Sequence, residues 1–216
     1  MIGRDQSPPV NPHLERPPVE LGAPLTDAQA VVVLVHGRGQ TPAYVREHIV
    51  EPAGRNDVAW RLPHAAADSW YPQSFLAPLG DNEPWLSHAL GAVDDIVRGL
   101  ADRGIEKRRL ILAGFSQGGC VVAEYAVRHP ARYGAVVACT GALIGPPGTT
   151  WDESGDFDGT PVRLTTAEED PWVPPWRVVE SAGVFERMGG AVEHRIFPGG
   201  DHAVRPDEVA LLTALL

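Results

Sequence analysis

The chain of 216 residues carries 18 Lys and Arg against 28 Asp and Glu, which gives a formal net charge of −10. This length is typical of one domain with a large core, and the acidic balance argues against nucleic acids and anionic membrane surfaces as partners, because both favour basic faces. Two cysteines, Cys120 and Cys139, are too few for a disulfide framework, so we expect a reducing compartment. The chain shows no apolar signal segment and no run of about 20 apolar residues to span a bilayer, which predicts a cytoplasmic protein without membrane insertion.

The first 27 residues form a proline-rich arm. Six prolines precede Leu25, and proline interrupts helices and is disfavoured inside sheets. We therefore expect residues 1–27 to be an extended or partly disordered lead-in that makes a poor strand, and residues 28–216 to form a single domain.

Beyond the arm, apolar runs typical of buried strands alternate with helical patterns. The first run, Val31–Val35, is continuous and β-branched, as expected of a strand that is buried on both faces. The predicted strands are Val31–Val35, Asp57–Leu62, Leu110–Ala113, Ala135–Cys139, Val162–Thr165 and Val192–Phe197, and the predicted helices are Pro42–Gly54, Glu83–Arg103, Gln117–His129, Trp176–Met188 and Pro206–Leu215.

This alternation predicts an α/β fold with a mostly parallel, doubly wound sheet and helices on both faces. In such sheets, ligands bind beyond the carboxyl ends of the strands, so the polar and glycine-rich segments at those ends are the candidate functional segments. The longest connections, Pro63–Asn82 and Thr140–Thr160, are too short for a helical cap domain. We expect a shallow site that is lined by loops and has no lid.

Ser116 lies in Gly114-Phe115-Ser116-Gln117-Gly118, directly after a predicted strand and directly before a predicted helix. In this context G-x-S-x-G is typical of a nucleophile elbow, a sharp turn that exposes the serine hydroxyl beside the free N–H groups of the helix start. The alternative is an ordinary glycine-rich turn in which the serine only caps the helix. The strand before it and the helix after it favour the nucleophile.

A second glycine-rich segment, His36-Gly37-Arg38-Gly39, follows the first predicted strand. An oxyanion hole in this type of site takes one backbone N–H from the residue after the nucleophile and one from an early strand–helix loop. Gln117 and Arg38 occupy those positions, and we expect His36 to shape the loop by hydrogen bonding. A phosphate-binding loop is the alternative, but Pro42 stands where G-x-G-x-x-G needs its third glycine.

A nucleophilic serine needs a general base, and that base needs an orienting acid. In α/β hydrolases the acid and then the histidine follow the serine along the chain, and three histidines lie beyond Ser116. His129 is typical of a helix C-terminal cap and His194 lies inside a predicted strand, whereas His202 lies in a loop after the last predicted strand. His202 is the predicted base, with a solvated loop histidine as the alternative.

The predicted acid lies in the loop after Val162–Thr165, which offers Glu168, Glu169 and Asp170. Asp170 begins the sequence DPWVP, whose prolines are expected to hold the loop and its carboxylate in place. Asp170 is therefore the predicted acid and Glu169 the fallback, although three successive acids are also typical of a solvated turn. Asp201 is adjacent to the histidine and cannot readily fold back to orient that ring.

Four aromatic residues follow predicted strands and are candidates for binding substrate. They are Trp70, Tyr71 and Phe75 in the long connection after the second strand, and Trp172 beside the predicted acid. The alternative is that these side chains only pack the loops onto the sheet. Trp60 is predicted to lie in the core, and Cys120 and Cys139 are predicted to be buried apolar residues.

Taken together, these segments resemble the phospholipase/carboxylesterase family of small α/β hydrolases, which includes the acyl-protein thioesterases. The motifs that carry the resemblance are LVHGRG (34–39), WYPQSF (70–75), GFSQGG (114–119), DPWVP (170–174) and PGGDH (198–202), and WYPQSF with Leu79 and Asn82-Glu83-Pro84 is similar to a bacterial branch of small esterases. The resemblance implies the α/β-hydrolase fold, a triad of Ser116, Asp170 and His202, oxyanion donors at Arg38 and Gln117, and no cofactor.

Two residues depart from the family pattern. Asp201 stands where a hydrophobic or small residue is expected, and an extra carboxylate there could raise the pKa of the histidine or favour a cationic substrate. Arg38 stands where the thioesterase branch has leucine, so its side chain could close part of an acyl channel.

We therefore expect a serine carboxylester hydrolase that acts on small to medium acyl esters, without metal or cofactor. Acyl thioesterase or lysophospholipase activity at the same site is an alternative, as is a binding protein that has the hydrolase fold but no turnover. A homodimer is left open.

Overall fold

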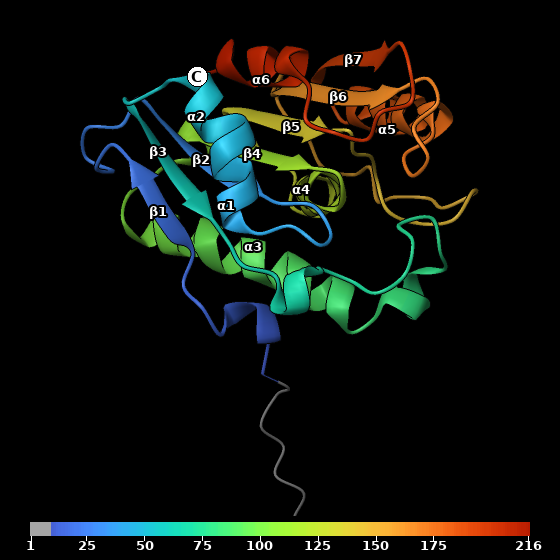
Figure 1. Cartoon of the computed structure of the whole chain (residues 1–216), viewed down its shortest axis with the longest axis horizontal. Helices are drawn as coiled ribbons and strands as arrows, with labels where there is room; N and C mark the ends of the chain where they lie inside the picture. The colour runs from blue at the N-terminus through green and yellow to red at the C-terminus, as the bar shows by residue number, and fades with distance from the viewer. Residues whose placement is uncertain (1–9) are drawn as a thin grey trace, which may run out of the picture.

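The computed structural model describes residues 10–216 and arranges seven strands in one sheet, in the order β1-β3-β2-β4-β5-β6-β7 (Figure 1). β1 pairs with β3 in antiparallel fashion, and every other pair is parallel. The α/β class and the mostly parallel sheet are therefore confirmed. The strands are β1 (Val19–Gly22), β2 (Ala30–Val35), β3 (Val58–Leu62), β4 (Leu110–Phe115), β5 (Ala135–Cys139), β6 (Pro161–Ala167) and β7 (Ala191–Phe197).

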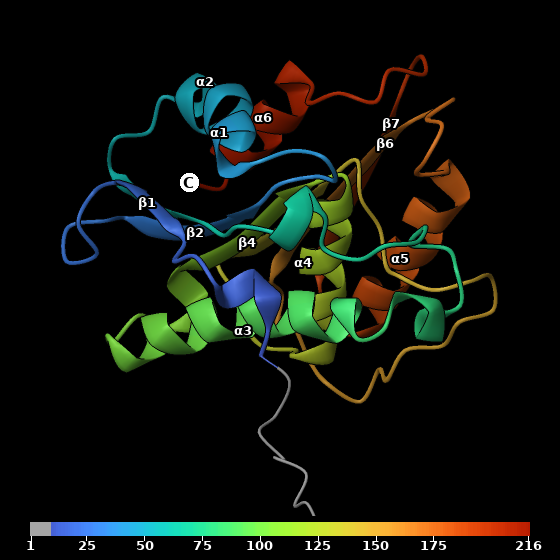
Figure 2. The same cartoon turned by 60° about the horizontal axis from the view of Figure 1, so that its bottom comes forward.

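Helices cover both faces of the sheet. One face packs against α3, α4 and α5, and the other against α1, α2 and α6 (Figure 2). No helix within residues 10–216 combines the length and the apolar character needed to cross a membrane. The helices are α1 (Pro42–Val45), α2 (Glu51–Ala53), α3 (Trp85–Asp102), α4 (Gln117–Arg128), α5 (Pro175–Arg187) and α6 (Pro206–Thr213).

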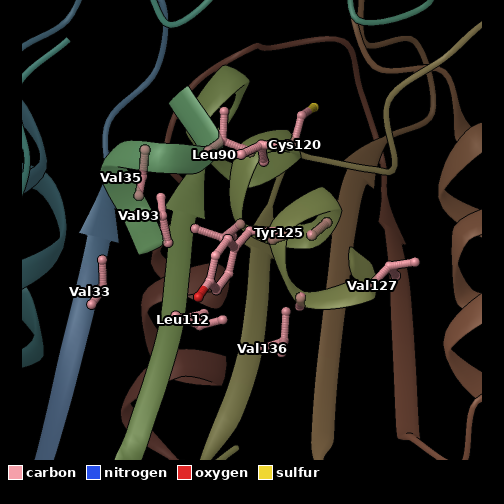
Figure 3. Close-up of a cluster of buried hydrophobic side chains, with 14 of the residues drawn as sticks. Val33, Val35, Leu90, Val93, Leu112, Cys120, Tyr125, Val127 and Val136 are labelled. Atoms are coloured by element: carbon pink, nitrogen blue, oxygen red, sulfur yellow. The ribbon is translucent and has the colours of Figure 1, made fainter. Parts of the chain in front are cut away.

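The central strands β2, β3, β4 and β5 are buried at every position. Because successive side chains of a strand point to opposite faces, each of these strands contributes side chains to two hydrophobic cores, one on each face of the sheet. Figure 3 shows the larger core, in which Val33, Leu112 and Val136 from the sheet lie under Val93 of α3 and Tyr125 of α4. The Tyr125 hydroxyl also donates a hydrogen bond to Asp94 (3.0 Å), which ties α4 to α3.

The described part of the N-terminal arm differs from the expected lead-in. Val19–Gly22 forms β1 and pairs with β3, from Val19 opposite Leu62 to Gly22 opposite Ala59. The prediction of a poor strand is wrong here because the prolines stop at Pro18, so Val19–Gly22 keeps its backbone donors and can extend the edge of the sheet. The part of that prediction that concerns residues 1–9 lies outside the described residues.

The segment predicted as one helix, Pro42–Gly54, is divided. A π-helical turn, Arg46–Val50, separates α1 from α2, and Gly54 ends the segment with a φ of +63°. The physical reason is that Pro52 has no N–H to continue the α-helical hydrogen-bond ladder, so the chain forms a wider turn before it.

The carboxyl ends of the parallel strands carry the segments with candidate functional residues. Neither long connection, 63–84 or 140–160, folds into a helical domain over this edge, because each contains at most short 3₁₀ turns. The prediction of a fold without a cap is confirmed.

Candidate active site

Ser116 occupies the sharp turn between β4 and α4, with φ +54° and ψ −122°. A non-glycine residue at this φ is strained, and such strain is typical of a functional turn. The two glycines of the motif are required sterically. A Cβ on Gly114 would lie 2.4 Å from the Gly118 backbone, and a Cβ on Gly118 would lie 2.1 Å from the carbonyl oxygen of Val35.

His202 joins the serine to Asp170 through two hydrogen bonds. Ser116 Oγ lies 2.7 Å from His202 Nε2, and His202 Nδ1 lies 2.8 Å from Asp170 Oδ2. The histidine side chain is 19% exposed and the aspartate side chain is 0% exposed. Motif, chain order and loop position together therefore selected three residues that the fold brings into contact.

The Asp170 carboxylate is held by donors on both of its oxygens. Oδ1 accepts the backbone N–H groups of Trp172 (2.9 Å) and Val173 (2.7 Å), while Oδ2 faces His202. Burial on its own raises the pKa of Asp170, but the hydrogen bonds from His202, Val173 and Trp172 outweigh it and bring the pKa below its usual value. An ionised Asp170 accepts a hydrogen bond from a protonated His202 Nδ1. His202 Nε2 then carries no proton and is free to accept the proton of the Ser116 hydroxyl.

The rejected candidates for base and acid lie away from this chain of contacts. His129 caps the C-terminus of α4 and contacts the carbonyl oxygen of Tyr125, as predicted, while His194 is exposed on β7. Glu169 and Asp201 are exposed. No salt bridge within residues 10–216 joins either acid to His202, whereas Asp170 makes that contact.

The loop His36–Gly39 lies against the serine. A Cβ on Gly37 would lie 3.2 Å from the Cβ of Ser116, so only glycine allows the approach without displacement. The Arg38 N–H makes no hydrogen bond to a group within residues 10–216, and the Gln117 N–H is the first of α4 and has no helical acceptor. Two backbone donors are thus available beside the serine hydroxyl.

His36 is buried and shapes this loop, as predicted. Its Nδ1 lies 2.8 Å from the Gly37 carbonyl oxygen, and its Nε2 accepts the Ala65 N–H at 3.3 Å. Burial lowers the pKa of His36, so the neutral ring with a proton on Nδ1 satisfies both contacts. His36 therefore acts on the backbone of the loop and does not face the serine.

A cavity of about 460 Å³ opens beside Ser116. Of the four aromatic residues predicted to bind substrate, Tyr71, Phe75 and Trp172 line it. Trp70 does not: it is 0% exposed, and its Nε1–H donates to the His36 carbonyl oxygen (2.8 Å). The prediction for Trp70 is wrong because its indole turns inward to support the loop His36–Gly39, whereas its neighbour Tyr71 faces the cavity.

The Arg38 side chain forms one wall of the cavity. Its guanidinium donates to three successive carbonyl oxygens, those of Tyr71 (2.9 Å), Pro72 (2.6 Å) and Gln73 (2.5 Å), and lies 5.9 Å from the centre of the Tyr71 ring. Three carbonyl acceptors orient the guanidinium and clamp the segment 71–73 to the loop His36–Gly39. Arg38 lines the cavity, and that its side chain closes part of an acyl channel stays a prediction.

Several residues that support the site carry no local sequence signal for this role. Asn82 accepts the Gln73 N–H (2.8 Å) and donates to the Ser74 carbonyl oxygen (2.9 Å), and the Gln117 amide bridges the backbones of Trp70 and Tyr71.

Cys120 lines the cavity one helical turn after Ser116, and burial raises the pKa of its thiol to about 12, so it remains an uncharged wall residue. Within residues 10–216, no three His, Cys, Asp or Glu side chains cluster in a way that could hold a metal ion.

Related proteins share both the sequence pattern and the fold. A family model described as Phospholipase/Carboxylesterase matches residues 19–216. Acyl-protein thioesterase 1 of Gibberella zeae is 28% identical, in an alignment that covers 87% of this chain and 89% of that protein. A crystal structure of a phospholipase/carboxylesterase from Dyadobacter fermentans is 36% identical with a TM-score of 0.84, over 92% of this chain and 94% of that chain.

More distant structures share the fold. SOBER1 of Arabidopsis thaliana has a TM-score of 0.70 at 17% identity, over 87% of this chain and 97% of its own. With the family model matched over residues 19–216, the chain belongs to the phospholipase/carboxylesterase family of α/β hydrolases.

Proposed function

We propose that the protein is a serine carboxylester hydrolase that cleaves small to medium acyl esters through an acyl-enzyme on Ser116. The observation that carries this proposal is the continuous chain of contacts from Ser116 Oγ through His202 to Asp170, at the edge of a cavity. Nucleophile, base and orienting acid in this arrangement are the groups that acyl transfer through a serine requires.

In the proposed mechanism, Ser116 Oγ attacks the carbonyl carbon of the ester while His202 Nε2 takes the hydroxyl proton. The N–H groups of Arg38 and Gln117 stabilise the negative charge that develops on the carbonyl oxygen, aided by the N-terminus of α4. The tetrahedral intermediate collapses when His202 returns the proton to the leaving alcohol. Water, activated by the same histidine, then hydrolyses the acyl-enzyme, and Asp170 orients the ring in both steps.

The shape of the cavity supports short or medium acyl groups. Its volume of about 460 Å³ lies towards the lower end of the range of about 300–1,000 Å³ that is common for small-molecule sites. Tyr71, Phe75 and Val173 give it apolar walls that suit an acyl chain, and the clamped Arg38 side chain limits its extent.

Thioester hydrolysis is the second candidate, because acyl-protein thioesterase 1 of Gibberella zeae is a relative and the same groups can attack a thioester. Turnover of ethyl butyrate and of S-ethyl thiobutyrate, which share both the acyl and the ethyl group, ranks the two activities. A higher kcat/KM for the thioester would favour the second candidate.

The test of the proposed function compares wild type with Ser116→Ala on p-nitrophenyl butyrate, with Ser87→Ala, at an exposed serine of α3, as the matched control. We expect Ser116→Ala to lose at least about 10³-fold in kcat and Ser87→Ala to lose nothing. A fluorophosphonate should label wild type and Ser87→Ala at one site per chain and leave Ser116→Ala unlabelled. Equal hydrolysis by wild type and Ser116→Ala would refute the mechanism, and the absence of labelling and hydrolysis in wild type would favour a binding protein without turnover.

A further inference from the structure

Glu208 is a fully buried carboxylate that the proposed mechanism does not use. It lies in the first turn of α6 and is 0% exposed. Oε1 accepts hydrogen bonds from the hydroxyls of Thr140 (2.8 Å) and Thr165 (2.5 Å), and Oε2 accepts the Arg205 N–H (3.0 Å). Burying a carboxylate without a cationic partner is costly, so these contacts are needed to keep it in place.

Two of these partners connect Glu208 to the serine turn. Thr140 directly follows β5, and the carbonyl oxygen of the preceding Cys139 accepts the Ser116 N–H (2.9 Å). The Thr140 N–H donates to Thr165 Oγ1 (2.8 Å), which joins the ends of β5 and β6. Glu208 is therefore bound to the same strand ends that hold the serine.

The third partner connects Glu208 to the loop that carries His202. This loop, residues 198–205, leaves β7 and ends at Arg205, the residue that precedes α6. Ahead of the histidine, the Gly199 carbonyl oxygen accepts the Glu169 N–H (3.0 Å); beyond it, the Arg205 N–H donates to Glu208. The carboxylate thus anchors the far side of the loop.

We propose that Glu208 is a positioning residue of the site, whose carboxylate joins the His202 loop to the ends of β5 and β6 and so sets the Ser116–His202 spacing. Burial raises the pKa of Glu208, although its hydrogen bonds oppose that effect. The inference rests on the proposed function, since the spacing matters only if His202 activates Ser116. A loss of alignment of about 1 Å costs on the order of 10²-fold in rate.

Glu208→Gln is the direct test. An amide has one acceptor oxygen in place of two. If its NH₂ group faces the Arg205 N–H, two donors meet; if it faces the threonines, their hydroxyls can no longer donate to the side chain and must turn to accept instead. Glu124→Gln is the matched control: Glu124 is also buried (1% exposed) and accepts the Ile144 N–H (3.1 Å), but it touches no residue of the His202 loop.

The measurement is the turnover of p-nitrophenyl butyrate per active site, with the sites counted by fluorophosphonate titration. We expect Glu208→Gln to lower kcat per titrated site about 10- to 100-fold with KM unchanged within about twofold, and to slow fluorophosphonate labelling in proportion. Glu124→Gln should leave kcat per site within about twofold of wild type. A purely structural role would reduce the number of titrated sites and leave the turnover of each site unchanged.

Thr140→Val provides a second variant, because it removes one hydroxyl donor to Glu208 and keeps the side-chain shape. We expect a loss of about 3- to 10-fold in kcat per site, and this variant decides the question if Glu208→Gln does not fold. Wild-type turnover per site in Glu208→Gln, or in Thr140→Val when the former does not fold, would overturn the inference. With Ser116→Ala inactive, that result would leave the proposed function intact; an active Ser116→Ala would refute the proposed function itself.

Discussion

His13 and Trp70 join the N-terminal segment to the connection that follows β3. His13 Nε2 donates to the Trp70 carbonyl oxygen (3.1 Å), His13 Nδ1 accepts the Ala66 N–H (2.9 Å), and the two aromatic rings lie 5.1 Å apart. Trp70 in turn donates to the His36 carbonyl oxygen. A residue of the proline-rich arm thus supports the loop that holds the candidate oxyanion donors.

We predict that His13 makes the fold sensitive to acid. Burial lowers the pKa of His13 to about 4. A proton added to Nδ1 would also face the Ala66 N–H, which this nitrogen accepts in the folded protein. Between pH 6.5, the ordinary pKa of histidine, and about pH 4, His13 of the unfolded chain binds a proton that His13 of the folded protein does not. This contribution to stability is therefore complete above pH 6.5 and is lost as the pH falls towards 4, by about 2 kcal/mol between pH 7 and pH 5.

Urea unfolding at pH 5, 6, 7 and 8 measures this contribution. The free energy of unfolding of His13→Gln should fall less steeply with acid than that of wild type, while His194→Gln, at an exposed position of β7, should follow the wild-type curve. Parallel curves for wild type and His13→Gln would contradict the prediction.

Asp170→Asn should lower kcat by about 10⁴-fold with little change in KM. Oδ1 faces the Trp172 and Val173 N–H groups, so the amide oxygen takes that place and the NH₂ group faces His202. His202 must then carry its proton on Nε2, where it cannot accept the serine proton. Steady-state kinetics of Asp170→Asn and of Glu169→Gln, a change at an exposed neighbour, check the assignment. A loss of kcat in Glu169→Gln alone would show that Glu169, and not Asp170, is the acid.

Arg38→Ala should shift the acyl preference towards longer chains. Removal of the guanidinium frees the carbonyl oxygens of Tyr71 and Gln73 and opens one wall of the cavity. We expect the ratio of kcat/KM for p-nitrophenyl octanoate to that for the acetate to rise about 10-fold, in line with the small energies with which apolar pockets distinguish chain lengths. Arg98→Ala, at an exposed position of α3, is the control; an unchanged ratio in Arg38→Ala would show that this side chain does not limit the channel.

Gly118→Ala should prevent the serine turn from forming, because its Cβ would lie 2.1 Å from the Val35 carbonyl oxygen. We expect a loss of more than about 3 kcal/mol in the free energy of unfolding, or no folded protein. Gly99→Ala in α3 is the matched control: a Cβ there meets nothing within 4 Å, and the change should stabilise the helix by about 0.5–1 kcal/mol. Thermal unfolding of both variants decides the matter, and equal melting temperatures would disprove the steric argument.

The strands and the serine turn could be predicted because their signals are local. The continuous apolar run of β2 and the period of α3 specify burial along a few consecutive residues, and Gly114, Ser116 and Gly118 lie within a single turn. Asp170 and His202 lie far from the serine in the chain, yet fold topology brings the carboxyl ends of parallel strands to one edge. Chain order together with their positions in loops after predicted strands was therefore enough to choose them. β1 was missed because the prolines before Val19 dominated the composition of its surroundings.

The sequence by itself thus determined the fold class and the choice of Ser116, Asp170 and His202 as the candidate triad, through periodicity, spacing and order. Only the tertiary structure decided which way individual loop side chains turn: Trp70 inward, Tyr71 to the cavity, Arg38 across three carbonyl groups and Glu208 beneath the His202 loop. The physical reason is that a loop residue has no repeating backbone geometry to orient it. Its direction is set by hydrogen-bond partners and packing surfaces that come from distant parts of the chain, and these exist together only in the folded protein.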